Sequence, residues 1–343
     1  MSFRIGLDIS GGDLAPREIF AGALLARQEL GAAITLIGKK NEIEREAERN
    51  KVDLWQFSVV DAPDKIKMAE SPALSVRRKK HSSIVIGTKL LKERKIDAFV
   101  SCGNTGAVVC ASSLELGLIK GVERPGIALA MPTLKDVSLV VDVGANIDAK
   151  PLHMLQYGAM ASVYYQLLLN RDNPTVGLLN IGEEESKGSE FVKTVYKLFS
   201  ASSLNFIGNV EPKDIFTGRC DCVVCDGFVG NIALKVTEGA AEAMGKYLVS
   251  LFKKDMMGLV GVLLMKSSLR KFRSKLDCTE YGGAPLLGVD GIVIIGHGRS
   301  TAKAVKNAIK VAIHELKRDL NLRIEENVGK ICNDSKVKQI LHT

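Results

Sequence analysis

Four short segments rich in glycine and asparagine have the composition of an anion-binding turn, and each follows an apolar run typical of a β-strand. They are Gly103–Gly106, Asp142–Asn146, Asn180–Glu184 and Asp226–Asn231. In α/β proteins, turns at the carboxyl ends of parallel strands present free backbone N–H groups to ligands, as helix N-termini do. We expect the four turns to leave one edge of one sheet and to form a single polar crevice for an anion.

A lysine follows the third segment and adds a positive charge to it. Lys187 precedes Gly188, and Gly182 lies five residues before it, so the backbone here can approach a ligand closely. An ammonium group at this place suits a phosphate-like anion. The three consecutive glutamates 183–185 would repel that anion unless they face away or bind cations. The alternative is a solvated lysine in the first turn of a helix.

Each asparagine, taken singly, is more typical of a turn or a helix cap. Asn231, for example, is placed to cap the long helix that follows it. Four such segments at strand ends favour a binding role. His297, between two glycines just after a strand, is the histidine that we expect near the crevice, whereas His153 and His314 lie within helices. The full set expected there is Asp13, Gly103, Asn104, Thr105, Gly106, Asp142, Asn146, Asn180, Gly182, Lys187, Asp226, Gly230, Asn231 and His297.

The elements that position these turns alternate between strands and helices, which predicts a mainly parallel sheet with helices on both faces. The tail after Leu320 is polar, and we expect it to be loosely held. The predicted strands are Arg4–Ile9, Ile34–Ile37, Phe57–Val60, Ala98–Ser101, Gly126–Ala130, Leu139–Val143, Val176–Ile181, Asn205–Ile207, Cys222–Cys225 and Gly291–Ile295. The predicted helices are Arg17–Leu30, Ile84–Arg94, Pro151–Leu169, Ser189–Ser200, Asn231–Phe252 and Thr301–Leu320.

The segment 247–276 breaks this alternation. An apolar run, 256–265, is too short to span a bilayer and is flanked by lysines and arginines. Such a pattern suits an amphipathic helical insertion that lies in a membrane interface or faces an acidic partner. A core or dimer-interface helix with a solvated basic face is the alternative.

Composition limits the remaining classes of function. The 343 residues are 46% hydrophobic and 25% charged, which predicts one α/β domain over 1–343, with two intimately joined halves as a variant. The net charge of +8 is concentrated in 246–277, but aromatic residues make up only 5%, so nucleic acid is the least favoured partner. The amino-terminal residues lack a signal-peptide pattern, and we expect a cytoplasmic protein. Phosphate-binding P-loop, hydrolase-elbow and dinucleotide-binding motifs are missing, and the histidine spacing predicts no metal site.

Seven ordered segments together resemble the bacterial fatty acyl-ACP:phosphate acyltransferase family (PlsX). The sequence departs from the usual pattern at Ile9-Ser10, at Cys102 and at Arg299. The matching segments are Gly11–Asp13, Ser101 with Gly103–Ala107, Asp142–Asn146, Asn180–Glu184 with Lys187-Gly188, Val224–Phe228 with Gly230-Asn231, Tyr281–Val289, and His297-Gly298.

This resemblance implies a three-layer α/β/α homodimer, related to isopropylmalate and isocitrate dehydrogenases and to phosphotransacetylase. It implies the reaction of acyl-ACP with inorganic phosphate to give acyl phosphate and free acyl carrier protein, with no cofactor. A membrane acyltransferase then transfers the acyl group to glycerol 3-phosphate. Catalytic roles fall on Lys187, Asn231 and Asn104. Contacts with the membrane or the carrier protein fall on Arg77, Arg78, Lys253, Lys254, Val260, Leu263, Leu264 and Arg270.

Two other readings remain open from the residues. A decarboxylating dehydrogenase would need a cluster of metal-binding aspartates and arginines for the substrate carboxylate, and the sequence offers no such pattern. A membrane-associated scaffold that binds acyl carrier protein would explain the basic segment but would leave the four polar turns without a role.

Overall fold

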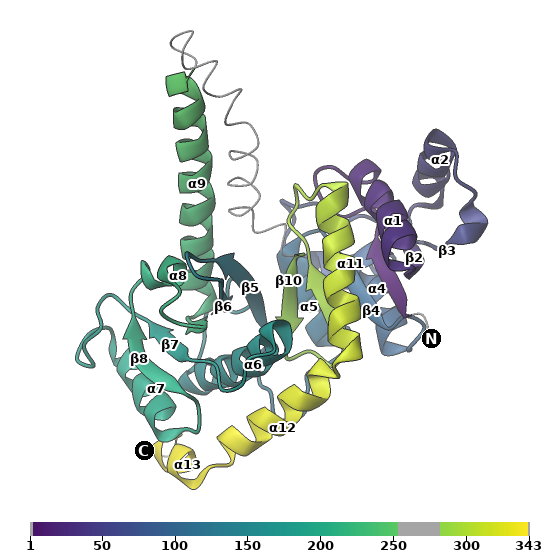
Figure 1. Ribbon diagram of the computed structural model, residues 1–343. Coiled ribbons are helices and arrows are strands. Elements are labelled where there is room, and N and C mark those ends of the chain that lie inside the picture. The colour runs from purple at the N-terminus through teal and green to yellow at the C-terminus, as the bar shows by residue number, and fades with distance from the viewer. Residues whose placement is uncertain (1–2, 253–281, 342–343) are drawn as a thin grey trace.

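The computed structural model describes residues 3–252 and 282–341. These residues form one sheet of 11 strands with helices on both faces, which confirms the expected α/β class (Figure 1). The strands lie in the order β3-β2-β1-β4-β11-β10-β5-β6-β9-β7-β8. Their bounds are β1 Arg4–Asp8, β2 Ala33–Gly38, β3 Ser58–Asp61, β4 Ala98–Ser101, β5 Gly126–Pro132, β6 Val137–Val141, β7 Val176–Leu179, β8 Phe206–Val210, β9 Cys222–Val224, β10 Ala284–Leu287 and β11 Ile292–Ile295.

The sheet contains two parallel blocks that run in opposite directions. The first block is β3, β2, β1, β4 and β11, and the second is β6, β9, β7 and β8. Between them, β10 is antiparallel to both β11 and β5, and β5 is antiparallel to β6. The expectation that all four turns leave one edge is therefore wrong. Gly103–Gly106 follows β4 of the first block, whereas the other three turns follow strands of the second.

Helices cover both faces of the sheet and enclose two apolar cores. Residues alternate between the two along a strand: in β4, Ala98 and Val100 belong to one core and Phe99 to the other. Helices α1, α2, α6, α7, α11, α12 and α13 pack on the first core, and α3, α4, α5 and α8 on the second. Their bounds are α1 Arg17–Leu30, α2 Lys40–Asn50, α3 Pro72–Arg78, α4 Ser83–Lys92, α5 Thr105–Glu115, α6 Pro151–Leu169, α7 Glu190–Ala201, α8 Asp214–Thr217, α11 Ala302–Lys317, α12 Leu320–Cys332 and α13 Ser335–Leu341.

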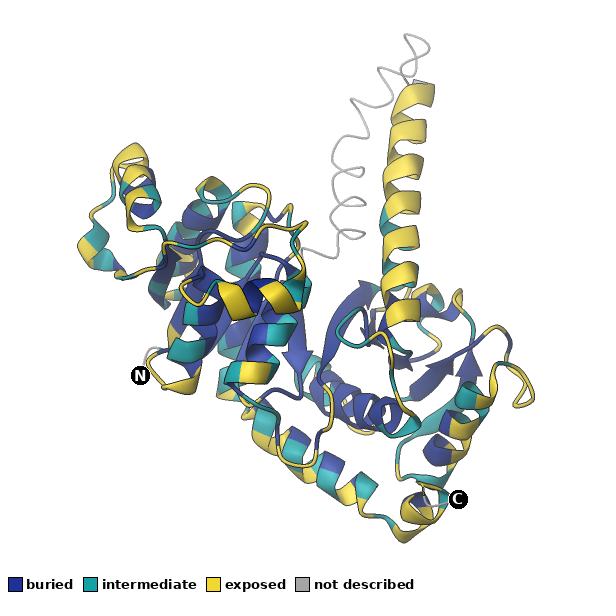
Figure 2. Cartoon of the chain, turned by 180° about the vertical axis from the view of Figure 1, so that it is seen from behind, coloured by how far each residue is buried: buried dark blue, intermediate teal, exposed yellow. Residues whose placement is uncertain are grey.

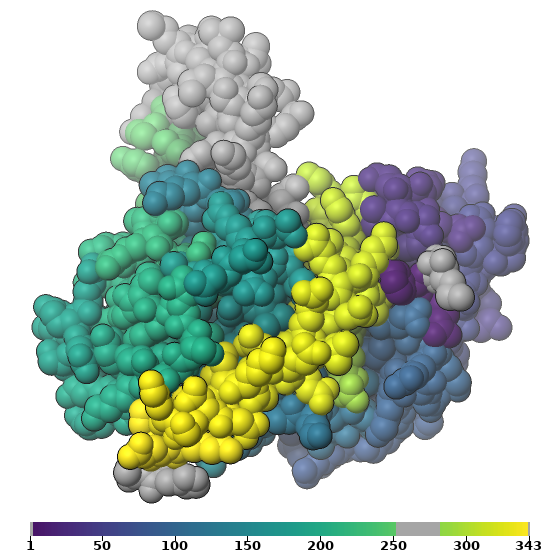
Figure 3. All heavy atoms as spheres, turned by 60° about the horizontal axis from the view of Figure 1, so that its bottom comes forward, coloured from purple at the N-terminus to yellow at the C-terminus, as the bar shows by residue number. Residues whose placement is uncertain are grey.

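The C-terminal residues are helical and well packed, which corrects the expectation of a loose tail. Leu320, Ile324, Val328 and Ile331 recur at helical spacing along α12 and are all buried. This stripe packs on α6, while α13 contacts α7. In Figure 3 the C-terminal segment, in yellow, crosses the molecule from the first block toward the second.

Helix α9, Gly227–Phe252, extends away from the body of the molecule and is exposed along most of its length (Figures 1 and 2). At its base, Gly230, Ala233, Leu234 and Thr237 line a small cavity together with residues of β5 and β6. The predicted insertion 247–276 lies mostly outside the described residues, and so do Lys253, Lys254, Val260, Leu263, Leu264 and Arg270. Among the described helices, none has the length and apolarity needed to cross a bilayer.

Candidate functional site

The turn after β6 is organised around the buried carboxylate of Asp142. Its Oδ1 accepts hydrogen bonds from the N–H groups of Ile127 (2.9 Å), Gly144 (3.0 Å) and Ala145 (2.9 Å), and its Oδ2 accepts one from Asn146 (2.7 Å). Burial raises the pKa of Asp142, although these backbone donors oppose the shift. Asp142 therefore shapes the turn, and its oxygens are already occupied.

Two glycines allow α9 to begin directly against this turn. The N–H of Gly227 donates to the carbonyl of Asn146 at 3.0 Å, and a Cβ on Gly227 would lie 2.5 Å from Asp142 Oδ2. A Cβ on Gly230 would overlap the carbonyl oxygen of Asp142. Side chains are excluded at both positions, so the turn after β6 and the first turn of α9 form one unit.

Asn231 does not cap α9, contrary to expectation, because the helix begins four residues earlier. Asp226 is the cap: its Oδ1 accepts hydrogen bonds from Phe228 (3.0 Å) and Val229 (2.9 Å). Asn231 is exposed, and its Cβ and Cγ lie 3.7 Å from the position of a Cβ built on Gly144. Its amide is therefore available beside the turn after β6.

A buried histidine supports this turn from behind. His153 Nδ1 accepts the Lys150 N–H at 3.0 Å, and its Nε2 lies 3.1 Å from the carboxylate of Glu123. Asn146 Nδ2 lies 3.4 Å from His153 Nδ1 and donates to the Tyr157 hydroxyl at 3.2 Å. The position of His153 next to Asn146 had no local signal in the sequence.

The loop after β7 is held by two buried amides. Asn180 Nδ2 donates to the Lys187 carbonyl at 3.1 Å, and Asn209 Nδ2 donates to the Glu184 carbonyl at 2.9 Å. Gly188 has φ +89, and a Cβ there would lie 2.8 Å from Asn180 Oδ1, so only glycine suits the position. The Lys187 side chain is exposed, and it has no ion pair with any carboxylate of the described residues. Asn209, which sequence reasoning missed, comes from β8.

The turn after β4 uses its asparagine differently. Asn104 Oδ1 accepts the Ala107 N–H at 3.0 Å and so caps α5, which is the alternative considered from the sequence. Its Nδ2 donates to the carbonyls of Lys67 (3.2 Å), Met68 (3.0 Å) and Glu70 (3.2 Å). Because every polar atom of the amide is engaged, direct donation from Asn104 to a substrate is not compatible with this arrangement. Gly103 and Gly106 leave room for Asp8 and Pro72, respectively, and Thr105 opens the helix.

The loop after β11 connects the two blocks through α9. His297 Nε2 lies 3.7 Å from Glu238 Oε1 on α9, and Asp13 donates its N–H to the Gly298 carbonyl at 2.7 Å. Lys246 lowers the pKa of Glu242, and the charge of Arg299 adds to the shift. An α-helix rises 1.5 Å per residue, so Glu238 lies about 10 Å along α9 from Asn231. The helix thereby brings the loop after β11 toward the turns of the second block.

The expected residues therefore form three groups. One contains Asp142, Asn146, Asp226, Gly230 and Asn231, a second contains Asn180, Gly182 and Lys187, and the third contains Asp13, Asn104 with its neighbours, and His297. Helix α9 connects the first group to the third. No hydrogen bond or ion pair between described residues joins Lys187 to Asn104 or Asn231.

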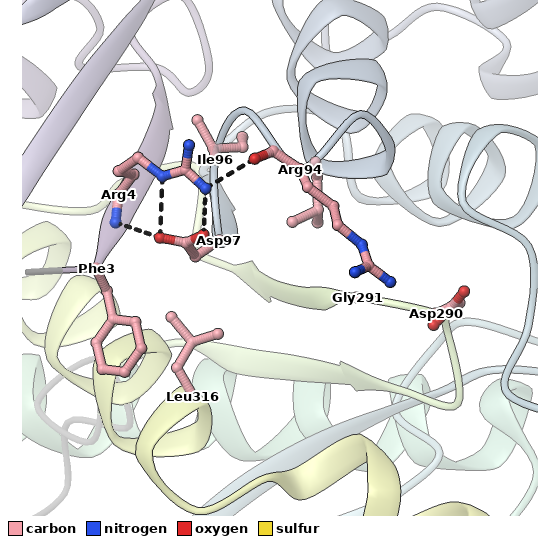
Figure 4. A pocket seen from close by; sticks show the side chains of 9 residues that line it. Phe3, Arg4, Arg94, Ile96, Asp97, Asp290, Gly291 and Leu316 are labelled. Atoms are coloured by element: carbon pink, nitrogen blue, oxygen red, sulfur yellow. Dashed lines mark hydrogen bonds and ion pairs between the residues drawn. The ribbon is translucent and has the colours of Figure 1, made fainter. Parts of the chain in front are cut away.

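A cavity of about 750 Å³ lies at the edge of the first block where β1, β4 and β11 begin (Figure 4). Its lining includes Phe3, Ile96 and Gly291, at or next to the starts of β1, β4 and β11, far from the turns that close those strands. Arg4 pairs with Asp97 there at 2.7 Å. We do not assign the chemistry to this cavity, since its size is not accompanied by convergent groups that could activate a substrate.

No group of three or more His, Cys, Asp or Glu side chains within 3–252 and 282–341 is placed to hold a metal ion. The cysteines of this part of the chain are free. Burial raises the pKa of Cys102 and of Cys220 to about 12, so neither thiol is an activated nucleophile at neutral pH.

Solved structures place the fold among phosphotransacetylase-like α/β proteins. A phosphotransacetylase from Streptococcus pyogenes matches with a TM-score of 0.63, covering 92% of this chain and 94% of its own, at 14% sequence identity. A 4-hydroxythreonine-4-phosphate dehydrogenase from Klebsiella pneumoniae matches with a TM-score of 0.53, covering 92% and 98%, also at 14% identity. At these identities the likeness concerns the fold alone.

The chain belongs to the fatty acid synthesis protein family, whose model matches residues 3–323. A protein named phosphate acyltransferase from Dictyoglomus turgidum is 46% identical over 332 residues, covering 96% of this chain and 99% of its own. A second, from Heliobacterium modesticaldum, is 47% identical over 335 residues, covering 96% and 98%. The family expected from the seven segments is thereby confirmed.

Proposed function

We propose that this protein is a phosphate acyltransferase that forms acyl phosphate from acyl-[acyl-carrier protein] and inorganic phosphate, and so supplies phospholipid synthesis. The observation that carries the proposal is the 46% identity to a relative of that name over 96% of the chain. The described turns agree with this chemistry, because they leave the ammonium group of Lys187 and the amide of Asn231 exposed and contain no activated protein nucleophile.

In the proposed reaction, Lys187 binds and orients the phosphate. An oxygen of hydrogen phosphate attacks the thioester carbonyl, the C–S bond breaks, and the proton of hydrogen phosphate ends on the released thiol. A thiol with a pKa of about 8.5 leaves readily, so no strong acid is required. The site has to overcome repulsion and align the attack, which an ammonium group and a side-chain amide can do.

Asn231 is the side chain that we assign to the oxyanion. Its amide is exposed beside Gly144, whereas the amide of Asn104 is committed to α5 and to the loop 67–70. We therefore revise the proposed role of Asn104 from donor to positioning residue. The loop that bears His297 contacts the same helix at Glu238, about 10 Å along α9 from Asn231.

The carrier protein, which is acidic, has a suitable docking surface on α3. Arg77 and Arg78 are exposed at the end of this helix, and Leu74, 53% exposed, lies one turn before them. Helix α3 starts at Pro72, whose ring is packed against Gly106 of the turn after β4. A carrier protein bound there would present its thioester next to the third group of site residues. Electrostatic complementarity of this kind mainly accelerates association.

We also propose that α9 takes part in a homodimer and in peripheral attachment to a membrane, in a protein that is otherwise cytoplasmic. Val236, Met244, Tyr247 and Leu251 lie on one side of the helix, because it turns 100° per residue, and each is at least 40% exposed. Attachment would place the product near a membrane glycerol-3-phosphate acyltransferase. Binding to anionic vesicles that survives Met244→Asp/Leu251→Asp in a folded protein would contradict the membrane role of α9.

The primary test mixes the purified protein with acyl-ACP and inorganic phosphate and measures the release of free thiol. Release that depends on both phosphate and acyl-ACP is the expected result. Turnover that requires a nicotinamide cofactor would indicate a dehydrogenase, and binding of acyl-ACP without thiol release would indicate a scaffold. Either of these results would overturn the proposal.

A further inference from the structure

In the loop after β7, Lys187 follows three glutamates in sequence. Its ammonium group nevertheless forms no ion pair with a carboxylate of the described residues. Glu183, Glu184 and Glu185 directly precede Ser186 and Lys187, and the Lys187 N–H donates to the Glu184 carbonyl at 3.1 Å. The Glu184 carboxylate and the Lys187 side chain both lie against Gly182, 2.9 Å and 3.2 Å from the position of a Cβ built there, so this turn brings at least one carboxylate next to the lysine. A carboxylate that paired with the ammonium group would compete directly with a bound anion, so a feature of the fold has to prevent it.

One of these carboxylates, that of Glu183, forms an ion pair with Arg219. Its Nη1 lies 2.6 Å from Glu183 Oε1 and 3.5 Å from Asp214 Oδ2. Arg219 comes from the connection between α8 and β9, which is remote in sequence from the loop. Its guanidinium lowers the pKa of Glu183, which therefore stays ionised and bound to arginine.

The position of Arg219 is itself fixed by the fold. Asp214 is buried, and its Oδ2 also accepts the Glu211 N–H at 3.0 Å, so one end of the contact belongs to the body of the protein. On the loop side, Asn209 holds the Glu184 carbonyl at 2.9 Å. The loop is thus held at Glu183 by a charged pair and at Glu184 by a hydrogen bond from the Asn209 side chain.

We propose that Arg219 is a positioning residue that keeps Glu183 away from Lys187 and so keeps the lysine available to phosphate. The proposal rests on the proposed function, since it concerns the same phosphate site. Stability alone does not explain the pair, because its side chains are 41% and 48% exposed and exposed ion pairs contribute little to stability. Its effect is local: it determines which cation the carboxylate binds.

The test is a double-mutant cycle in the acyl transfer assay. Arg219→Gln releases Glu183, which then competes with phosphate for Lys187, so KM for phosphate rises about fivefold to tenfold. The value of kcat and KM for acyl-ACP stay within about twofold of wild type, since the carrier binds elsewhere. Glu183→Gln alone leaves KM for phosphate unchanged, and the double variant Glu183→Gln/Arg219→Gln restores the wild-type KM.

The rescue distinguishes positioning from a merely structural role. A double variant with the same raised KM as Arg219→Gln would contradict the proposal, and so would an unchanged KM in Arg219→Gln. Arg219→Lys is the conservative control, because it keeps the cation and should stay near wild type. If circular dichroism shows that Arg219→Gln does not fold, the test rests on Glu183→Gln alone. A severalfold lower KM for phosphate in that variant would mean that Glu183 already competes for Lys187 in the wild type, and so that Arg219 does not keep it away. Absence of activity in the wild type would instead refute the proposed function.

Discussion

Asn104 and Lys187 occupy similar places, each in a glycine-rich turn just after a buried strand, but the fold treats them in opposite ways. Asn104 is 6% exposed; its Oδ1 accepts one hydrogen bond, and the two hydrogens of its Nδ2 are shared among three carbonyl oxygens. Lys187 is exposed, its backbone is held from both sides, and its ammonium group has no carboxylate partner among the described residues.

The difference in hydrogen bonding and exposure distinguishes polar groups that hold the site in shape from polar groups that can bind the substrate. A buried amide must find partners, because an unpaired one would cost stability, and Asn104 finds all of them within the protein. A charged group left at the surface, while its own backbone is fixed, is free to bind a ligand. The comparison predicts an activity defect at one position and a stability defect at the other.

The largest effect is expected from Lys187→Ala. The loss of the ammonium group should lower kcat/KM for phosphate about a hundredfold, because it removes charge stabilisation at the reacting anion. The thermal unfolding midpoint should hardly change, since Lys187 makes no ion pair with any carboxylate in 3–252 or 282–341. Lys193→Ala is the matched control, as Lys193 pairs with Glu190 on α7 and should retain activity. Near-normal turnover in Lys187→Ala would remove this residue from the mechanism.

Asn104→Ala should reveal the opposite behaviour. Loss of the cap and of the hydrogen bonds from Nδ2 to the loop 67–70 is expected to reduce the free energy of unfolding by about 2–3 kcal/mol. Asn104→Asp keeps the cap acceptor but places a carboxylate against three carbonyl oxygens, so it should be no more stable than Asn104→Ala. Urea denaturation measures both. If Asn104→Asp were as stable as wild type while losing activity, direct catalysis by Asn104 would be the better reading.

Gly188→Ala tests whether the loop must be held in one conformation. Gly188 has φ +89 and the Asn180 amide against it, whereas Gly31 has φ +62 and nothing within 4 Å. Gly31→Ala should cost about 1 kcal/mol of stability from backbone strain alone. Gly188→Ala should cost more, about 2 kcal/mol, and should also raise KM for phosphate. Equal stability losses with an unchanged KM would show that the loop tolerates rearrangement.

The smallest effect concerns pH and the buried His153. Burial lowers its pKa from the ordinary 6.5, outweighing the opposite effect of Glu123, while Arg124 and Lys150 add to the lowering. Protonation therefore favours the unfolded chain. The contribution of His153 is complete above pH 6.5 and is lost as the pH falls toward the lower folded value. Unfolding free energies measured from pH 7.5 to 5.5 should decline less steeply in His153→Gln than in wild type; identical slopes would contradict the assignment.

Local patterns predicted the elements well but not their directions. Strand β4 and helices α1 and α6 have the predicted bounds, because each is a strongly periodic or continuously buried segment. Strand β10 was missed, since its four residues include Pro285 and follow two glycines, which reads as a loop. The two antiparallel pairings of β10 cancel, so the reversal between the two blocks arises at the antiparallel pair β5 and β6, whose relative direction the strand patterns alone did not give. The apolar residues of α12 recur at helical spacing, which predicts a helix: they are Leu320, Ile324, Val328 and Ile331. The helix was missed because the residues between them are mostly polar, which favoured the interpretation as a loose tail.

The sequence predicted which turns contain the candidate site residues, but it did not predict which residues from other elements contact those turns. The positions of Gly188 and Gly230 could be anticipated, because glycine in such turns signals a special backbone or a close approach. The partners Asn209 and Arg219 could not, since they reach the loop from other strands and connections. The amide of Asn104 forms its hydrogen bonds within the protein because the carbonyls of the loop 67–70 lie next to it, and the sequence of that loop does not indicate this contact.

The central position of β10 and β11 has a consequence for biosynthesis. These two strands join β4 to β5 across the middle of the sheet, yet they come after residue 283. A ribosome that has made all earlier strands has therefore produced two sheet fragments, each with an unpaired inner edge. Exposed edges of this kind invite pairing with other chains. The nascent polypeptide consequently depends on the segment that begins at Ala284 to close both edges, and a premature stop before this residue leaves two aggregation-prone fragments in place of a smaller enzyme.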